Sequence, residues 1–248
     1  AQGKAPWRLG ALLLILGGLA GLVWDPAFFH VRMSPYKTLS QALRIPEARI
    51  AFWKWNAFSR VQVVESPSIR SAPGLSLAYG RPLPPQAGLV IDGSNLQPIT
   101  RWDGAEDMDF VRYLPNWALY SLQPHGRALI LSPGGGLAVQ TALLGGARSV
   151  VAVEPNPLVA RLLREEYGDY AGHIYDNPRT RLVVEDVRAF MRTEQGAFDT
   201  IEFALSDTWR PVASGAYSLS EDYTLTREAF GSALAHLAPG GILAATRW

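Results

Sequence analysis

Short apolar runs alternate with amphipathic stretches through the second half of the chain. Each run has the length of a strand buried on both faces of a parallel sheet, and the runs lie at residues 128–131, 149–153, 182–184, 200–205 and 242–246. The stretches between them repeat apolar positions every three or four residues, as helices do. Strands that alternate with helices predict a doubly wound parallel sheet of the α/β class, in which ligands bind beyond the carboxyl ends of the strands.

Before residue 106 the pattern changes to short segments of β character that proline and glycine separate. These segments cover residues 49–55, 60–65, 75–79 and 89–92, a spacing that is typical of a small antiparallel sheet. We therefore predict a β subdomain at residues 49–105 and a Rossmann-like domain at residues 106–248. Residues 26–48 form a connector ahead of both.

An uncharged apolar run extends from Leu9 to Trp24. It is near the lower length limit of a membrane-spanning helix, and Trp7 and Trp24 stand where interfacial aromatic residues lie. We predict a transmembrane or signal-anchor segment at residues 1–25, with a cleaved signal peptide as the alternative because basic residues precede the run. We expect a membrane-anchored protein with its soluble domain in the cytoplasm, although basic residues on both sides of the run leave its orientation open.

The composition excludes several classes of function. The chain has 23 Lys and Arg against 22 Asp and Glu, a net charge of +1, and therefore no nucleic-acid footprint. It has no cysteine, which excludes disulfides and thiolate metal sites. The four histidines are scattered at positions 30, 125, 173 and 236, and we predict no metal site from them.

A glycine-rich turn, Ser132 to Gly136, follows the first of the expected parallel strands. Glycine leaves no Cβ between the main chain and a ligand, and the next helix points its free N–H groups at the turn. The following strand ends on Glu154, 18 residues after Gly136, where an acid can accept hydrogen bonds from ribose hydroxyls. Val139 stands where a dinucleotide site has its third glycine, so the turn favours S-adenosylmethionine or its decarboxylated form over NAD. An ordinary glycine loop is the alternative.

These features resemble the spermidine synthases, which are aminopropyltransferases, and among them the membrane-attached members. The resemblance covers residues 49–248 and consists of short motifs in the family's order, at residues 60–65, 91–93, 132–136, 153–154, 185–187, 198–199, 225–228 and 237–241. It implies the fold of the class I S-adenosylmethionine-dependent transferases. That fold has two strands beyond the last one predicted here, so we expect the C-terminal strands to be missing from this chain.

The resemblance also implies a set of cofactor-binding residues: Gln62, Ser132, Gly134, Gly136, Glu154 and Asp186. Glu154 matches the family acid that holds the ribose, and the alternative is a solvated strand end. Asp186 matches the aspartate that accepts from the adenine amino group, although Asp is also favoured as an ordinary helix N-cap. Gln62 matches a glutamine at the cofactor, and the alternative is a strand glutamine that faces water.

The chain departs from the family where the amine substrate is bound. The family has an aspartate that helps to deprotonate the attacking amine, and the matching residue here is Ala204. An amine with a pKa of about 10 is protonated at neutral pH and cannot attack until a base removes its proton. Asp207 falls on a family acidic position and is our candidate catalytic base, with a turn residue as the alternative. Arg112, near the family's substrate motif, would repel a polycation. Other acids that could supply a base are Glu202, Glu221 and Asp222.

We therefore predict a spermidine synthase-like transferase that binds S-adenosylmethionine or its decarboxylated form. Its substrate is then less cationic than a polyamine, or the acids for a true aminopropyl transfer come from elsewhere. The alternative is a non-catalytic homologue, a structural or binding component of a membrane complex. Expected partners are the membrane, other membrane-protein subunits and, from the resemblance, a second copy bound through the β subdomain. Trp53 and Trp55 suit either an apolar substrate or a protein interface.

Overall fold

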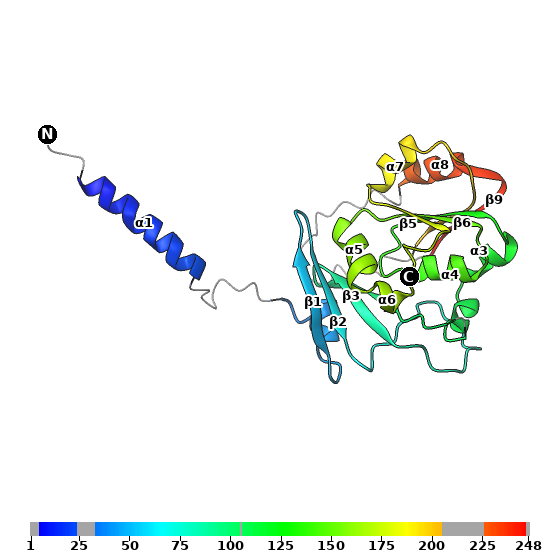
Figure 1. The fold of residues 1–248 in the computed structure, drawn as a ribbon, viewed down its shortest axis with the longest axis horizontal. Coiled ribbons are helices and arrows are strands. Elements are labelled where there is room, and N and C mark those ends of the chain that lie inside the picture. The colour runs from blue at the N-terminus through cyan, green and yellow to red at the C-terminus, as the bar shows by residue number, and fades with distance from the viewer. Residues whose placement is uncertain (1–4, 24–32, 105, 205–225, 247–248) are drawn as a thin grey trace. The chain divides into compact units, whose positions relative to one another are not determined.

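The computed structural model describes residues 5–23, 33–104, 106–204 and 226–246 of the chain. It divides into two compact units, residues 1–34 and 35–248, which are described separately here. Figure 1 shows the elements of each unit.

The described residues of the first unit form helix α1 (Ala5–Val23) over the apolar run. Its length of 19 residues corresponds to a rise of about 28 Å, against a hydrocarbon core of about 30 Å. In the part of the chain that the structure describes, no helix is both long and apolar enough to cross a membrane. The predicted transmembrane segment is therefore not supported.

The second unit begins with helix α2 (Thr38–Ala42) and a four-stranded antiparallel sheet. The strands are consecutive in the order β1-β2-β3-β4, with bounds Arg49–Trp55, Arg60–Glu65, Gln86–Ile91 and Ser94–Thr100. A tight turn joins β3 to β4, and both Asp92 (φ 51°) and Gly93 (φ 71°) have the left-handed backbone that short hairpins favour. Pro98 lies in β4, an edge strand, where its missing N–H costs no sheet hydrogen bond.

The strand predicted at residues 75–79 is wrong. This segment has turns and no strand. Leu75 and Tyr79 are instead partly buried against Met108 and Phe110, in a small cluster formed by loops and a short helix. Their apolar character is satisfied there without any strand pairing, and the sheet takes β4, which the sequence pattern missed, as its fourth strand.

The predicted parallel sheet is confirmed. Its strands run in the order β7-β6-β5-β8-β9, and every neighbouring pair is parallel. In chain order they are β5 (Arg127–Leu131), β6 (Ser149–Val153), β7 (Thr180–Val183), β8 (Phe198–Phe203) and β9 (Leu237–Ala245).

Helices cover both faces of this sheet. Figure 1 shows α7 and α8 on one face and α4, α5 and α6 on the other. Beyond α2, the described residues of the second unit form the helical segments η2 (Asp109–Tyr113), α3 (Trp117–Leu122), α4 (Leu137–Leu144), α5 (Pro157–Arg161), η3 (Leu162–Glu166), α6 (Gly168–Ala171), α7 (Val187–Thr193) and α8 (Arg227–Ala235).

One hydrophobic core joins the two sheets. Val63 of β2 and Leu89 of β3 are fully buried in the same cluster as Ile130 of β5 and Val139 of α4. A second cluster, which includes Phe198 of β8, lies against the opposite face of the parallel sheet. The antiparallel sheet is thereby fixed over the carboxyl ends of the parallel strands, where the candidate site residues lie.

Candidate functional site

The glycine-rich turn lies directly after β5, as predicted. Ser132 (φ 56°), Gly134 (φ 52°) and Gly136 (φ 90°) all have left-handed backbone, which is strained for the serine and open to the glycines. The Ser132 N–H donates to the Val153 carbonyl across to β6, 2.8 Å away. Gly136 caps the start of α4.

The protein's own atoms occupy the space that the missing side chains leave open. A Cβ on Gly134 would lie 1.7 Å from Gln97 Oε1, and one on Gly135 would lie 2.2 Å from the Pro98 carbonyl oxygen. A Cβ on Gly136 would lie 2.5 Å from Ile174 Cδ1. The Gly135 N–H donates to Gln97 Oε1 at 3.2 Å. Close approach of β4 therefore accounts for Gly134 and Gly135, and close approach of Ile174 accounts for Gly136, whereas the sequence suggested that a ligand does.

Glu154 lies at the end of β6 and is buried next to the turn, with 4% of its surface exposed. Its Oε2 accepts from the Gly134 N–H at 3.1 Å and its Oε1 from the Asn156 N–H at 2.9 Å. Burial raises the pKa of Glu154 to about 7, although the two backbone hydrogen bonds act in the opposite direction. The structure thus brings together the turn and the acid that the sequence singled out.

A network of side chains covers Glu154 and connects it to the antiparallel sheet. Asn156 caps α5, and its Nδ2 donates to Ser59 Oγ at 3.0 Å. Asn56 Nδ2 donates in turn to Asn156 Oδ1 at 2.7 Å. Asn56 and Ser59 belong to the turn between β1 and β2, so this hairpin is held against the loop after β6. The sequence signalled only a helix start at Asn156-Pro157, because the partners are about 100 residues away.

Asp186 and Gln62 lie apart from this network. Asp186 is exposed and caps α7, where its Oδ1 accepts from the N–H groups of Arg188 and Ala189, both at 3.0 Å. This is the helix-capping role that the sequence left open. Gln62 is 1% exposed on β2 between Val61 and Val63, which enter the shared core. Side chains alternate along a strand, so Gln62 points to the opposite face of the sheet, away from Glu154. Within the described part of the chain its amide has no hydrogen-bond partner.

A small pocket adjoins the other side of the glycine turn, with a volume of about 70 Å³. It lies between β4, the segment from η2 to α3, the start of α4 and the ends of β8 and β9. Its described lining is mostly apolar: Pro73, Leu96, Gln97, Pro98, Leu114, Pro115, Asn116, Pro133, Gly135, Leu137, Ala138, Glu202, Ala204 and Thr246.

Glu202 of β8 is the carboxyl group of that described lining, and only 4% of it is exposed. Asn116 Nδ2 donates to Glu202 Oε1 at 2.9 Å, and the Tyr120 hydroxyl donates to Oε2 at 2.8 Å. Burial raises the pKa of Glu202 to about 7 against the lowering effect of these two bonds. The sequence named Glu202 among several possible bases, and the structure places it in a pocket.

The two curated relatives compared here are both polyamine aminopropyltransferases. No family model matches the chain. The polyamine aminopropyltransferase of Mycobacterium tuberculosis is 32% identical over 160 residues, which are 62% of this chain and 28% of that protein. Polyamine aminopropyltransferase 2 of Streptomyces coelicolor is 32% identical over 170 residues, 67% of this chain and 27% of that protein.

Solved structures agree on the fold. Spermidine synthase from Thermotoga maritima superposes with a TM-score of 0.55 at 18% identity. The superposition covers 79% of this chain and 56% of that chain. A spermidine synthase in complex with the transition-state analogue AdoDATO gives a TM-score of 0.53 at 16% identity, with the same coverage. The chain is spermidine synthase-like. It spans less than a third of the length of these two curated relatives.

Ala204, which the sequence resemblance matched to the family's aspartate, is among the residues that the structure describes. Ala204 directly follows β8 and is 5% exposed, and its N–H donates to the Leu131 carbonyl at 3.1 Å. It lines the pocket together with Glu202. Asp207, the candidate base, lies outside the described residues, as do Glu221 and Asp222.

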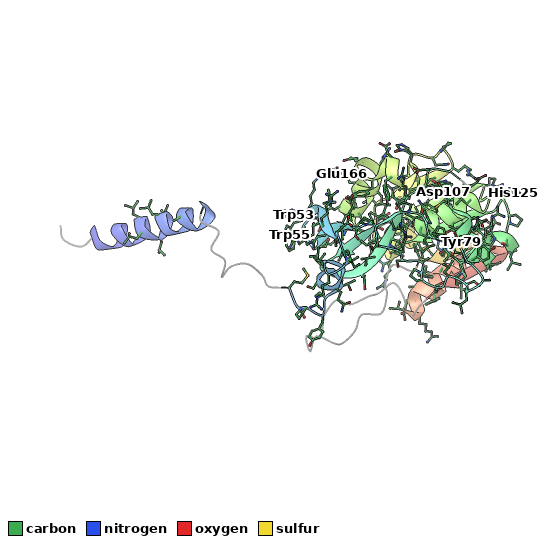
Figure 2. The ribbon with its side chains drawn as sticks, turned by 90° about the horizontal axis from the view of Figure 1, so that it is seen from below. Trp53, Trp55, Tyr79, Asp107, His125 and Glu166 are labelled. Atoms are coloured by element: carbon green, nitrogen blue, oxygen red, sulfur yellow. The ribbon has the colours of Figure 1, made fainter. Side chains whose placement is uncertain are left out.

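The tryptophans that the sequence placed near the site lie elsewhere. Trp53 and Trp55 on β1 are 57% and 65% exposed, and Figure 2 shows the two residues close together. The Arg60 guanidinium lies 5.2 Å from the Trp53 ring centroid and 5.6 Å from that of Trp55. Neither ring lines the pocket.

Proposed function

We propose that this chain is part of an aminopropyltransferase-like enzyme that takes decarboxylated S-adenosylmethionine as its donor. The observation that carries the proposal is the buried pair of Glu154 and Gly134 at the ends of adjacent strands, in a chain similar to polyamine aminopropyltransferases. A carboxylate next to a bare backbone turn suits a ribose diol, because each oxygen can accept one hydroxyl proton.

Glu154 retains capacity for this role. Each of its oxygens accepts one backbone hydrogen bond, whereas a carboxylate has about four acceptor sites in all. The donor would enter where Gln97 lies over Gly134 and where the β1–β2 turn covers Asn156. Binding therefore requires Gln97 to rotate and the hairpin to move outward.

The reaction proposed for the pocket is a displacement at carbon. The acceptor nitrogen attacks the methylene carbon bonded to the sulfonium, the new C–N bond forms as the C–S bond breaks, and sulfur keeps the electron pair as a neutral thioether. The acceptor amine must lose a proton to a base. Asp207 stays our proposed base from the sequence, and Glu202 is an acid of the pocket's described lining.

One observation favours a second candidate, a non-catalytic subunit with an inherited fold. The glycine turn is already filled by Gln97 and the Pro98 carbonyl, so a folded chain needs no ligand there. Such a protein would bind neither form of the donor.

Titration calorimetry of the full chain with decarboxylated and ordinary S-adenosylmethionine, added separately, tests the proposal. We expect the decarboxylated form to bind and Glu154→Gln to weaken it at least tenfold, because the amide replaces one acceptor oxygen by a donor. Glu166→Gln, which removes an exposed carboxylate, is the control and should bind as the wild type does. If the wild type binds neither compound, the proposed function falls and the non-catalytic candidate remains.

A further inference from the structure

The hairpin formed by β1 and β2 carries a group of exposed aromatic side chains. Trp53 and Trp55 on β1 are 57% and 65% exposed, and Phe58 in the turn that follows is 65% exposed. Figure 2 shows both tryptophans at the outer edge of the second unit. A group of large apolar side chains in contact with water commonly marks a surface that binds another molecule.

The two faces of β1 have different surroundings. Side chains alternate along a strand, so Phe52 and Lys54 share one face while Trp53 and Trp55 share the other. Phe52 packs against the core that joins the two sheets, and Lys54 Nζ lies 3.4 Å from Glu166 Oε1 of η3. The first face is therefore used inside the second unit, and the face with the tryptophans points away from those contacts.

Arg60 of β2 adds a positive charge to the tryptophan face. It is the register partner of Trp55, and its guanidinium carbon lies 5.2 Å from the Trp53 ring centroid and 5.6 Å from that of Trp55. The Asp92 carboxylate accepts from the Arg60 backbone N–H at 2.8 Å. Within the described part of the chain, however, no carboxylate forms an ion pair with the Arg60 guanidinium. The face thus combines two indole rings with a cation that lacks an ion-pair partner there.

The charge of the hairpin favours an anionic partner. Residues 49–60 contain three basic residues and no Asp or Glu. Arg49 pairs with Glu65 and Lys54 with Glu166, so Arg60 is the hairpin cation that keeps its charge for a molecule outside the chain. A guanidinium binds phosphate oxygens with two parallel hydrogen bonds, and phosphate is the anionic group of a lipid surface.

The aromatic side chains favour a lipid surface over a protein strand. Tryptophan is enriched at the level of the lipid headgroups, because its ring is apolar and its N–H is polar. Phe58 places an apolar ring at the hairpin tip, where Asn56 Oδ1 accepts from the N–H groups of Phe58 and Ser59 at 3.1 and 2.7 Å and fixes the turn. A protein strand paired along β1 leaves this tip outside its hydrogen bonds, whereas a bilayer contacts face and tip together.

We propose that the hairpin of β1 and β2 docks on an anionic lipid surface. Trp53, Trp55 and Phe58 enter the headgroup region, and the Arg60 guanidinium binds a lipid phosphate. This contact needs neither a donor nor an acceptor substrate, so it does not depend on the proposed function. It also needs no helix that spans the membrane.

A fluorescent label on the full chain tests the contact. The chain has no cysteine, so Ala57→Cys, at an exposed position of the turn, takes an environment-sensitive thiol dye at one site. We expect its emission to shift to the blue with vesicles of phosphatidylcholine and phosphatidylglycerol, and much less with phosphatidylcholine alone. The same dye on Leu234→Cys, an exposed position of α8, is the control and should not shift. A local label is needed because α1 also exposes leucine side chains and can bind vesicles by itself.

Substitutions in the chain labelled at position 57 assign the contact to its side chains. Arg60→Gln should lower the affinity for the anionic vesicles about fivefold, the usual effect of one basic residue near such a surface. Trp53→Ala combined with Trp55→Ala should lower it about tenfold or more, because two interfacial aromatic rings are lost. Arg148→Gln removes a charge at an exposed position ahead of β6 and should bind as the parent does.

Three results would overturn the proposal: no blue shift at position 57, equal shifts with the two kinds of vesicle, or unchanged affinity in the hairpin variants. A blue shift that appears without vesicles and grows with protein concentration would also overturn it. In that case a second copy of the chain, rather than lipid, covers the hairpin.

Discussion

Glu154 and Glu202 stand at the ends of parallel strands, each 4% exposed and each with a pKa raised to about 7. They differ in the groups that donate hydrogen bonds to their carboxyl oxygens. Backbone N–H groups hold Glu154, as expected for a group that shapes a loop, whereas side chains from one helical segment hold Glu202. The first couples the glycine turn to the antiparallel sheet, and the second borders a pocket.

The raised pKa of Glu202 predicts how its replacement changes stability with pH. In the unfolded chain a glutamate ionises near its ordinary pKa of about 4.3, whereas folded Glu202 keeps its proton up to about pH 7. The folded state thus binds the extra proton in this window, and the free energy of unfolding falls as the pH rises through it. We subtract the unfolding free energy of the wild type from that of Glu202→Gln. This difference should increase by on the order of 3 kcal/mol between pH 4.5 and 8.

Urea denaturation of the wild type and Glu202→Gln across this pH range measures the difference. Glu166→Gln, which changes an exposed carboxyl, should give a curve parallel to that of the wild type. A parallel curve for Glu202→Gln as well would show that Glu202 has the same pKa in both states.

At the scale of elements, the glycine turn and strand β4 form one packed unit. The turn was predicted from its own residues, but β4 was not, because Pro98 interrupts its β character and its packing partner lies over 30 residues further along the chain. Gln97 makes the contact, and its oxygen both fills the space over Gly134 and accepts from the Gly135 N–H.

A double-mutant cycle on Gly134→Ala and Gln97→Ala tests this contact. Alanine at position 134 pays about 1–2 kcal/mol for its left-handed backbone and a further cost for collision with Gln97. Gln97→Ala alone loses a hydrogen bond of about 1 kcal/mol. We expect the loss of unfolding free energy in the double variant to be smaller than the sum of the two single losses by about 1–2 kcal/mol, measured by urea denaturation. Additive losses would mean that Gln97 does not pack on the turn.

At the scale of the whole second unit, the two sheets share one core and are held together by polar bridges. Asn156 joins them through Ser59 and Asn56, and the Tyr167 hydroxyl donates to Glu65 Oε1 of β2 at 2.8 Å. Because the largest hydrophobic cluster belongs to both sheets, each sheet loses that cluster without the other. We expect residues 35–248 to unfold as one cooperative unit.

Asn156→Ala tests this coupling. The variant loses a helix cap and both bridging hydrogen bonds, and we expect a loss of about 2 kcal/mol with a single thermal transition retained in calorimetry. Asn177→Ala, which removes one exposed turn bond to the Arg179 N–H, should cost about 0.5 kcal/mol or less. Two separate transitions in Asn156→Ala would show that the sheets unfold independently.

The sequence by itself determined the parallel sheet, the place of the glycine turn and the acid after β6. These follow from local patterns: a strand buried on both faces is apolar throughout, and a left-handed turn favours glycine wherever it occurs. The same local character led to the wrong strand at residues 75–79, where the loop cluster around Phe110 partly buries Leu75 and Tyr79 instead.

Only the tertiary structure decided what surrounds those residues. The contacts of Gln97 with Gly134, of Asn156 with Asn56 and Ser59, and of Glu202 with Asn116 and Tyr120 join residues 37 to 100 positions apart along the chain. A periodic pattern records which positions are buried, but not which distant atom lies against them. Whether a bare turn receives a ligand or a strand of the same chain therefore depends on packing between elements far apart in the sequence.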